Sequence, residues 1–159
     1  MIQNARSRIS VTSPYYVPDE TIQMAMVTAG SRGLDVELFV SEIGDQFMVF
    51  HAQRSYYEQL LRAGVKIYLY RVPTMLHAKH LSIDDDVAVI GSSNLDIRSL
   101  SLHMELSVLV HGADFTAAMR AVEDDYRSNS REVVLEEWLR RPARARIFDN
   151  LMRLTSSLQ

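Results

Sequence analysis

The sequence lacks cysteine, long apolar runs and repeats, and each absence removes a class of protein. Without cysteine among the 159 residues, disulfide frameworks, zinc–thiolate sites and cysteine nucleophiles are excluded. No apolar stretch approaches the roughly 20 residues that a membrane-spanning helix needs, and no signal peptide stands at the start. The remaining composition, 47% hydrophobic and 23% charged, is typical of one globular domain.

Net charge is also small, at -3, so the chain has no general attraction for nucleic acid. The charges are nevertheless unevenly distributed, because four arginines gather near the end and three consecutive aspartates stand in the middle. These residues are Arg140, Arg141, Arg144 and Arg146, and Asp84, Asp85 and Asp86. Aspartates in a row between two strand-like segments are typical of a solvated turn.

Hydrophobic periodicity predicts strands and helices in alternation. Strands are expected at residues 8–12, 34–40 and 65–70, where apolar and β-branched residues alternate or cluster. Helices are expected at about 19–30 and 45–63, each stopped by glycine. Further along, the pattern predicts a strand pair at 76–83 and 87–90, a strand at 106–110, and helices at 115–126, 132–140 and 143–158. This order indicates the α/β class, with a mixed β-sheet flanked by helices.

One stretch carries a pattern suited to phosphate chemistry, His-x-Lys-x4-Asp-x6-Gly-Ser-x-Asn. On the predicted strand, His77 and Lys79 point the same way, because strand residues two apart share a face. An ammonium neutralises phosphate oxygens, and an imidazole attacks phosphorus or transfers a proton. Asn94 adds an amide donor, while Gly91 and Ser92 allow close backbone approach and offer hydrogen bonds. A lone His-x-Lys on a strand is usually a pair of exposed residues without a specific function, but the full spaced pattern favours a functional site.

This spaced pattern resembles the signature of the phospholipase D superfamily. The matching residues are His77, Lys79, Asp84, Gly91, Ser92 and Asn94. The similarity extends outward: residues 12–20, 54–57, 63–68 and 92–99 resemble segments in the carboxy-terminal catalytic half of bacterial cardiolipin synthases. One departure is His103, which stands where those synthases usually carry Asn, two residues before Glu105.

The resemblance implies a phospholipase D-like α/β/α sandwich and a two-step displacement at phosphorus without metal or cofactor. One histidine forms a phosphohistidine, and a second protonates the leaving alcohol and later deprotonates the incoming one. Each family motif supplies one histidine, so His77 needs a partner from a missing amino-terminal half or from a second copy of the chain. By the pattern of two-motif relatives, His77 is the general acid.

Roles for the other motif residues follow from the same resemblance. Catalysis is assigned to His77 and Lys79 together with Glu105, which orients the imidazole by a hydrogen bond. Ser92 and Asn94 are assigned to the substrate phosphate. Asp84 and Gly91 are expected to be structural, Asp84 by organising the hairpin.

The resemblance also implies a substrate and a location. Residues 1–140 are expected to be the catalytic domain of a phosphatidyltransferase that makes cardiolipin from phosphatidylglycerol. Residues 141–159 are expected to form a basic amphipathic helix, which rests on a membrane surface or packs on its own domain. The full-length protein would lie at the bacterial cytoplasmic membrane, with this piece alone soluble. Phospholipid and membrane are favoured as partners over nucleic acid.

Two other interpretations stay open. A single-motif phosphodiesterase or nuclease would work as a homodimer, although the acidic balance argues against DNA as its substrate. A catalytically incomplete half-domain would bind without turnover.

Among other residues, Tyr15 and Tyr16 either line a lipid channel or pack in the core, and Arg98 either contacts substrate or braces its loop. His80 is expected to be a packed or surface histidine, and a metal site that combines it with His103 is disfavoured.

Overall fold

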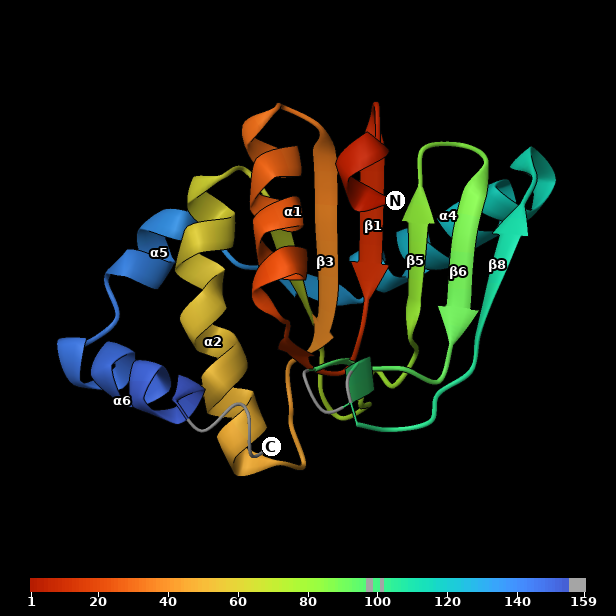
Figure 1. The fold of residues 1–159 in the computed structure, drawn as a ribbon. Helices are drawn as coiled ribbons and strands as arrows, with labels where there is room; N and C mark the ends of the chain where they lie inside the picture. Colours follow the sequence, from red (N-terminus) through yellow and green to blue (C-terminus); the bar gives the residue numbers. More distant parts are fainter. Residues whose placement is uncertain (97–98, 101, 155–159) are drawn as a thin grey trace.

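A seven-stranded mixed sheet forms the centre of the molecule (Figure 1). The computed structural model describes residues 1–96, 99–100 and 102–154. The strand order is β8-β6-β5-β1-β3-β4-β9, in which β1, β3 and β4 are parallel and the other neighbours are antiparallel. The strands are β1 (Arg8–Thr12), β3 (Asp35–Ser41), β4 (Lys66–Tyr70), β5 (His80–Ile83), β6 (Val87–Gly91), β8 (Ser107–His111) and β9 (Ser130–Glu132). This sheet and its flanking helices confirm the predicted fold class.

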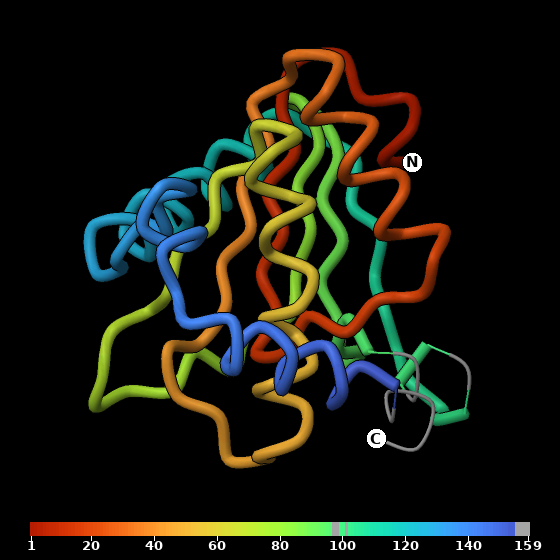
Figure 2. The backbone as a smooth tube through the Cα atoms, turned by 90° about the vertical axis from the view of Figure 1, so that its left-hand side faces the viewer, coloured from red at the N-terminus to blue at the C-terminus, as the bar shows by residue number. Residues whose placement is uncertain are grey.

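Helices lie on both faces of the sheet. α1 (Glu20–Ser31) and α2 (Phe47–Arg62) connect the parallel strands and cover one face, while α4 (Ala113–Ser128) crosses the other (Figures 1 and 2). The carboxylate of Asp19 caps α1 by accepting the amide hydrogen of Ile22 at 2.8 Å. The remaining elements are η1 (Ile2–Asn4), β2 (Tyr16–Val17), β7 (Leu95–Asp96), α5 (Leu135–Leu139) and α6 (Ala143–Arg153).

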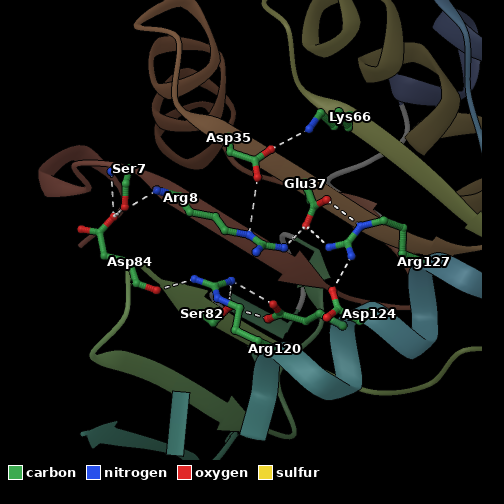
Figure 3. Close-up of polar contacts among 11 residues, drawn as sticks. Ser7, Arg8, Asp35, Glu37, Lys66, Ser82, Asp84, Arg120, Asp124 and Arg127 are labelled. Carbon is green, nitrogen blue, oxygen red and sulfur yellow. Dashed lines mark hydrogen bonds and ion pairs between the residues drawn. The ribbon is translucent and has the colours of Figure 1, made fainter. Parts of the chain in front are cut away.

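The two faces are held by different forces. Between the sheet and the pair α1 and α2 lies the main apolar core, where burial of each large side chain contributes about 1.5–3 kcal/mol. Its largest buried members are Tyr16, Tyr57, Ile9, Met26, Leu38 and Leu60. Beneath α4 the sheet carries charges instead, as Figure 3 shows: Glu37, 2% exposed, accepts hydrogen bonds from Arg8 at 2.8 Å and from Arg127 at 2.7 Å.

Two local predictions were wrong, and one strand pairing was missed. Residues 76–79 are not part of a strand, because β1 ends at Thr12 opposite His80 and the chain then turns at Pro14, which has no amide hydrogen to donate. The helix expected from residue 132 begins only at α5, and Ser130–Glu132 instead pairs with the edge of β4. The two-residue strands β2 and β7 pair with each other and were not predicted.

The carboxy-terminal helix α6 packs on α2 and crosses its first half (Figure 2). Asp149 of α6 is 2% exposed and accepts a hydrogen bond from Arg141 at 2.9 Å. The division of the chain after residue 140 stays a prediction. Across the described residues, the helices lack the combination of length and apolar content that crossing a bilayer requires.

Candidate active site

The motif residues other than Asp84 lie at one end of the strands, the lower edge of the sheet in Figure 1. In the register, Thr12 pairs with His80, His80 with Ile90, and Ile90 with Val108. The carboxyl ends of β1 and β6 therefore lie beside the amino ends of β5 and β8. Segments that are up to about ninety residues apart in the sequence meet at this edge, which positions the motif.

His77 and Lys79 lie in the extended segment that leads into β5 rather than on the strand itself. The carbonyl of Lys79 accepts the amide hydrogen of Gly91 at 3.2 Å, which continues the ladder by one residue. The Lys79 ammonium donates to the backbone carbonyl of His77 at 2.7 Å, and His77 is exposed. The two residues are thus brought together, although by a local hydrogen bond and not by the strand geometry that the sequence predicted.

Burial lowers the pKa of Lys79, while the nearby carboxylates of Glu105 and Asp96 act to raise it. The ammonium is therefore partly desolvated and faces two acidic groups across the site. Electrostatic interactions strengthen when water is removed. Binding of a phosphate by this ammonium stays a prediction.

Gly91 is required by the close approach of β6 to β8. A β-carbon at this position would lie 2.6 Å from the carbonyl oxygen of Leu106 and 2.5 Å from Oγ of Ser107. Any side chain would therefore push the two strands apart at the point where the motif loop leaves β6. The predicted structural role of Gly91 has a direct steric basis here.

Ser92 and Glu105 are joined by a hydrogen bond from the serine hydroxyl to the carboxylate. The serine oxygen also accepts the amide hydrogen of Leu106 at 3.1 Å, and the serine amide donates to the carbonyl of Leu106 at 3.0 Å. Both hydrogen donors of Ser92 are therefore already used within the protein. Its predicted contact with phosphate stays a prediction and would require Ser92 to release Glu105.

The Glu105 carboxylate also lies 3.9 Å from Nδ1 of His103, the residue that departs from the synthase pattern. Within the described part of the chain, Glu105 forms no hydrogen bond with His77. His77 lies before β5, and in the described sheet the pairing of β5 with its neighbours begins only at His80. The backbone of His77 is therefore not fixed relative to Glu105 by the sheet. Orientation of the imidazole by Glu105 stays a prediction.

Asn94 is held beside the motif by the loop that follows β1. The Ser13 hydroxyl accepts the amide hydrogen of Leu95 at 3.1 Å, and Tyr16 of β2 pairs with Leu95 of β7. The carboxamide oxygen of Asn94 is buried without a partner in the described structure. Buried polar atoms are normally hydrogen-bonded, so an unpaired one marks a place that a ligand or a water completes.

A cavity of about 220 Å³ opens beside these residues. Lys79, Gly91 and Ser93 lie on its wall. Most of the remaining lining is apolar and comes from Ile22, Met26, Leu81, Val89, Leu95 and Leu100. The motif thus borders a largely apolar hollow that Lys79 helps to line.

Asp84 lies at the opposite ends of the strands, where β5 ends and β1 begins. Its carboxylate accepts the amide hydrogens of Arg6, Ser7 and Arg8 at 2.8–3.2 Å. Figure 3 shows the contacts with Ser7 and Arg8. Burial alone would raise the pKa of Asp84, but these hydrogen bonds outweigh it and lower the pKa. The residue ties the hairpin to the start of β1, far from Lys79.

The other weighed residues are placed as follows. Tyr15 and Tyr16 are 3% and 0% exposed and pack in the core, so neither lines an open channel. His80 is buried beneath α4 with its ring 5.8 Å from that of Tyr126, which confirms a packed histidine. Arg98 and residues 155–159 lie outside the described residues. Across the described ranges, no group of three or more His, Asp or Glu side chains is arranged to hold a metal ion.

One known protein family matches most of the chain. Residues 1–125 match the family described as cardiolipin synthase, PLD-like domain. The chain belongs to this family. It is 35% identical over 157 residues to cardiolipin synthase A of Proteus mirabilis (strain HI4320) and 37% identical over 154 residues to that of Klebsiella pneumoniae (strain 342). These alignments cover 99% and 97% of the chain, but the chain spans only 32% of each relative.

Solved structures share the fold of this PLD-like domain at low sequence identity. The phospholipase D family member Nuc of Salmonella typhimurium has a TM-score of 0.73 at 19% identity, with 84% of this chain and 86% of that chain covered. Phosphatidylserine synthase of Haemophilus influenzae Rd KW20 has a TM-score of 0.75 at 15% identity, with 99% and 41% covered. The resemblance noted in the sequence is confirmed at the level of family and fold.

Two residues that position the PLD-like site were not predicted from the sequence. Ser13 joins the loop after β1 to the segment after Asn94, and Asp96 acts electrostatically on Lys79. Serine before proline is a common loop signal, so Ser13 gave no sign of a partner 82 residues away. Asp96 stands two residues after Asn94, and its role becomes visible only when β2 and β7 pair.

Proposed function

We propose that this chain supplies one histidine–lysine motif of a phosphatidyltransferase that joins two phosphatidylglycerol molecules into cardiolipin and releases glycerol. The observation that carries the proposal is the partly desolvated ammonium of Lys79, bonded to the backbone of His77 beside a hollow bordered by Gly91 and Ser93. The relatives named cardiolipin synthase A support the choice of substrate.

The chemistry follows from the groups at this edge. A nucleophilic histidine attacks phosphorus, and a P–N bond forms as the P–O bond to glycerol breaks. His77, acting as general acid, gives its proton to the departing oxygen. A hydroxyl of the second phosphatidylglycerol then gives its proton to His77 as its oxygen attacks phosphorus, so that a new P–O bond forms, the P–N bond breaks and the nucleophilic histidine is released. Lys79 neutralises the non-bridging oxygens, whose charge builds up in each transition state.

Three further residues support this chemistry: Asn94, Glu105 and Ser92. We assign the carboxamide oxygen of Asn94, which is buried without a partner in the described structure, to accepting a hydrogen bond from a substrate hydroxyl, and its NH2 group to donating to a phosphate oxygen. We assign Glu105 to the imidazole of His77 once the second histidine is in place, and Ser92 to holding Glu105 until then. Such an exchange would orient the ring and stabilise its protonated form.

The second histidine comes from outside this motif, and we propose that the amino-terminal half of a longer protein supplies it. The relatives are about three times as long as the chain, which leaves room for another such half. Next to the site, a row of apolar side chains is exposed before and along the edge strand β8: Leu102, Met104, Leu106 and Val108. A partner that covers this row would bring its own motif to the same edge.

A membrane surface is the natural second partner, since the proposed substrate is a bilayer lipid. We place the longer protein at the bacterial cytoplasmic membrane for the same reason. Substrate presented in a bilayer must reach an edge of the sheet that faces the lipid, and the lower edge in Figure 1 carries all the motif residues that we assign to the phosphate.

The test is cardiolipin formation from phosphatidylglycerol in detergent micelles, measured by mass spectrometry on the longer protein that carries this chain. His77→Ala and Lys79→Met should each lower the rate by at least about a hundredfold, the usual contribution of a general acid or a charge-stabilising group. His111→Ala is the matched control, because His111 is an exposed histidine at the far end of β8. Full activity of His77→Ala would overturn the proposal.

The homodimeric interpretation is tested separately with the chain alone. Hydrolysis of a chromogenic phosphodiester in EDTA, lost in His77→Ala, would show that two copies complete a site. Activity only after an amino-terminal fragment is added would support the two-half arrangement instead.

A further inference from the structure

The carboxy-terminal helix α6 turns its apolar side chains toward solvent. Ile147, Leu151 and Leu154, spaced to share one helix face, are 68%, 52% and 77% exposed. The opposite face, which packs on α2, carries the charged Asp149 at 2% exposure. An ordinary surface helix has the reverse arrangement, so the apolar stripe of α6 is available for a partner.

Asp149 fixes this rotation of the helix. Its carboxylate is bonded to Nδ1 of His51 at 2.8 Å, to Arg141 at 2.9 Å and to Arg54 at 3.4 Å. Arg141 in turn lies over the ring of Trp138, 3.4 Å from its centroid. Turning the stripe inward would break these contacts and leave charges without partners, which is costly in a buried site.

The start of α2 extends the apolar stripe. Phe47 is 64% exposed, and its ring lies 6.1 Å from that of Phe148 on α6, with Met48 exposed beside it. We call Phe47, Met48, Ile147, Phe148, Leu151 and Leu154 the α2–α6 patch. The patch is larger than the single apolar side chains that are normal on a protein surface.

Arginine is concentrated in the segment that contains α6. Residues 140–154 contain five arginines and one aspartate, although the whole chain has a net charge of -3. The one aspartate is Asp149, which is buried. An apolar stripe with cationic flanks is the pattern of a helix that lies in the interface of an anionic bilayer.

The patch is linked to the active site through contacts at the start of α2, which lies in the lower part of the molecule in Figure 1. Phe47 begins α2 two residues after Asp45, and Asp45 accepts a hydrogen bond from the Tyr15 hydroxyl. Tyr15 lies two residues from Ser13, which holds the segment after Asn94. The α2–α6 patch and the strand ends that carry the motif therefore lie at the same end of the molecule, the lower end in Figure 1.

We infer that the α2–α6 patch docks on the surface of a bilayer that contains anionic lipid and holds the active-site edge toward it. This inference deepens the proposed function, because it names the surface through which that site meets its lipid substrate. Pairing of two copies patch to patch would bring their arginines together, so charge complementarity selects the anionic bilayer over a second copy. Each arginine near an anionic surface contributes about fivefold to binding.

The experiment uses the absence of native cysteine, which permits one labelled position at a time. Leu151→Cys carrying a polarity-sensitive dye should shift to the blue with vesicles of phosphatidylcholine and phosphatidylglycerol, and much less with phosphatidylcholine alone. The control is Met24→Cys with the same dye, because Met24 is 55% exposed on α1, away from the patch. Equal shifts at the two positions, or none at Leu151, would overturn the inference.

Co-sedimentation with the same vesicles gives the second measurement. Ile147→Ser combined with Leu151→Ser should weaken binding by about tenfold or more, whereas Met24→Ser combined with Val122→Ser should not. All four side chains are exposed, so the folded chain should tolerate both pairs. A dye shift that appears on concentration without vesicles, with a doubled mass, would assign the patch to a second copy and overturn the bilayer assignment.

The outcome is independent of the catalytic assignment. His77→Ala should bind vesicles as the unchanged chain does, because His77 is not part of the patch. Loss of cardiolipin formation in His77→Ala with normal vesicle binding supports both claims. Normal catalysis in micelles without vesicle binding overturns only the docking inference.

Discussion

Ser92 donates its hydroxyl hydrogen to Glu105 across the ends of β6 and β8. This bond places a carboxylate at the same edge as Lys79, and the negative charge of Glu105 acts to raise the pKa of the ammonium. Burial acts in the opposite direction and dominates, so the pKa of Lys79 is lowered. The balance between these two effects sets the pH range in which the site keeps its cation.

Glu105→Gln should move the alkaline limb of the pH–rate profile to lower pH. The substitution removes a charge that raises the pKa of Lys79 and leaves the burial that lowers it, so the lysine loses its proton earlier as pH rises. The measurement is the rate of cardiolipin formation against pH. Glu132→Gln, at an exposed carboxylate on β9, should leave the limb in place. A limb that stays fixed or moves upward in Glu105→Gln would contradict the electrostatic account.

Asp84→Asn should lower stability without lowering activity measured well below the melting temperature. The carboxylate accepts three backbone amide hydrogens, and losing the charge should cost about 1–2 kcal/mol, or about 2–4 °C in Tm per kcal/mol. Asparagine tolerates the positive φ of 51° at this position. Asp85→Asn, in the neighbouring exposed turn, should change stability by no more than about 0.5 kcal/mol.

The stabilisation by Asp84 should also depend on pH. Because the folded-state pKa of Asp84 is lowered, its stabilisation is present above the ordinary value of 3.8 and disappears as pH falls through the folded pKa. The difference in Tm between the unchanged chain and Asp84→Asn should therefore shrink in acid below that value. A difference that stays constant down to strongly acidic pH would show that the substitution acts through shape and not through charge.

The sheet was largely predictable, because its central strands carry strong local patterns. β1, β3 and β4 are apolar and β-branched, and α1 and α2 end where glycine stands. The sequence could not reveal β9, whose residues Ser130, Arg131 and Glu132 have no apolar alternation. This strand exists because the backbone of β4 offers it a free edge. Long-range pairing of this kind leaves no local signal.

The identities of the motif residues were predictable from spacing, but their contacts were not. A strand would have placed His77 and Lys79 on one face, whereas the structure brings them together through the bond from the ammonium to a carbonyl. The Ser92–Glu105 bond depends on the pairing of β6 with β8, which only tertiary structure defines. Likewise, the outward stripe of α6 follows from the cations that bury Asp149.

Two ion pairs with the same 2.8 Å separation should differ widely in strength. Glu37 is buried and accepts from Arg8 and Arg127, so Glu37→Ala should cost about 3–5 kcal/mol by leaving two guanidinium groups without their acceptor. The Lys66–Asp35 pair is exposed, and Lys66→Ala should cost less than about 1 kcal/mol. Urea unfolding measures both. Similar losses in the two variants would refute the idea that burial beneath α4 decides the difference.

Gly91→Ala should impair the site more than its small size suggests. The new methyl group would meet the carbonyl oxygen of Leu106 at 2.6 Å and Cα of Ser107 at 3.0 Å, and these backbone atoms at the start of β8 move only if the strand moves. Overpacking of this kind costs about 1–3 kcal/mol. The displaced β8 would also separate Ser92 from Glu105, so activity should fall even at temperatures where the variant is fully folded. Ala88→Gly, in the same strand but away from the site edge, should lower stability and leave the activity of the folded enzyme unchanged. If Gly91→Ala lost stability alone, the close approach of β6 and β8 would matter for folding and not for the geometry of the motif.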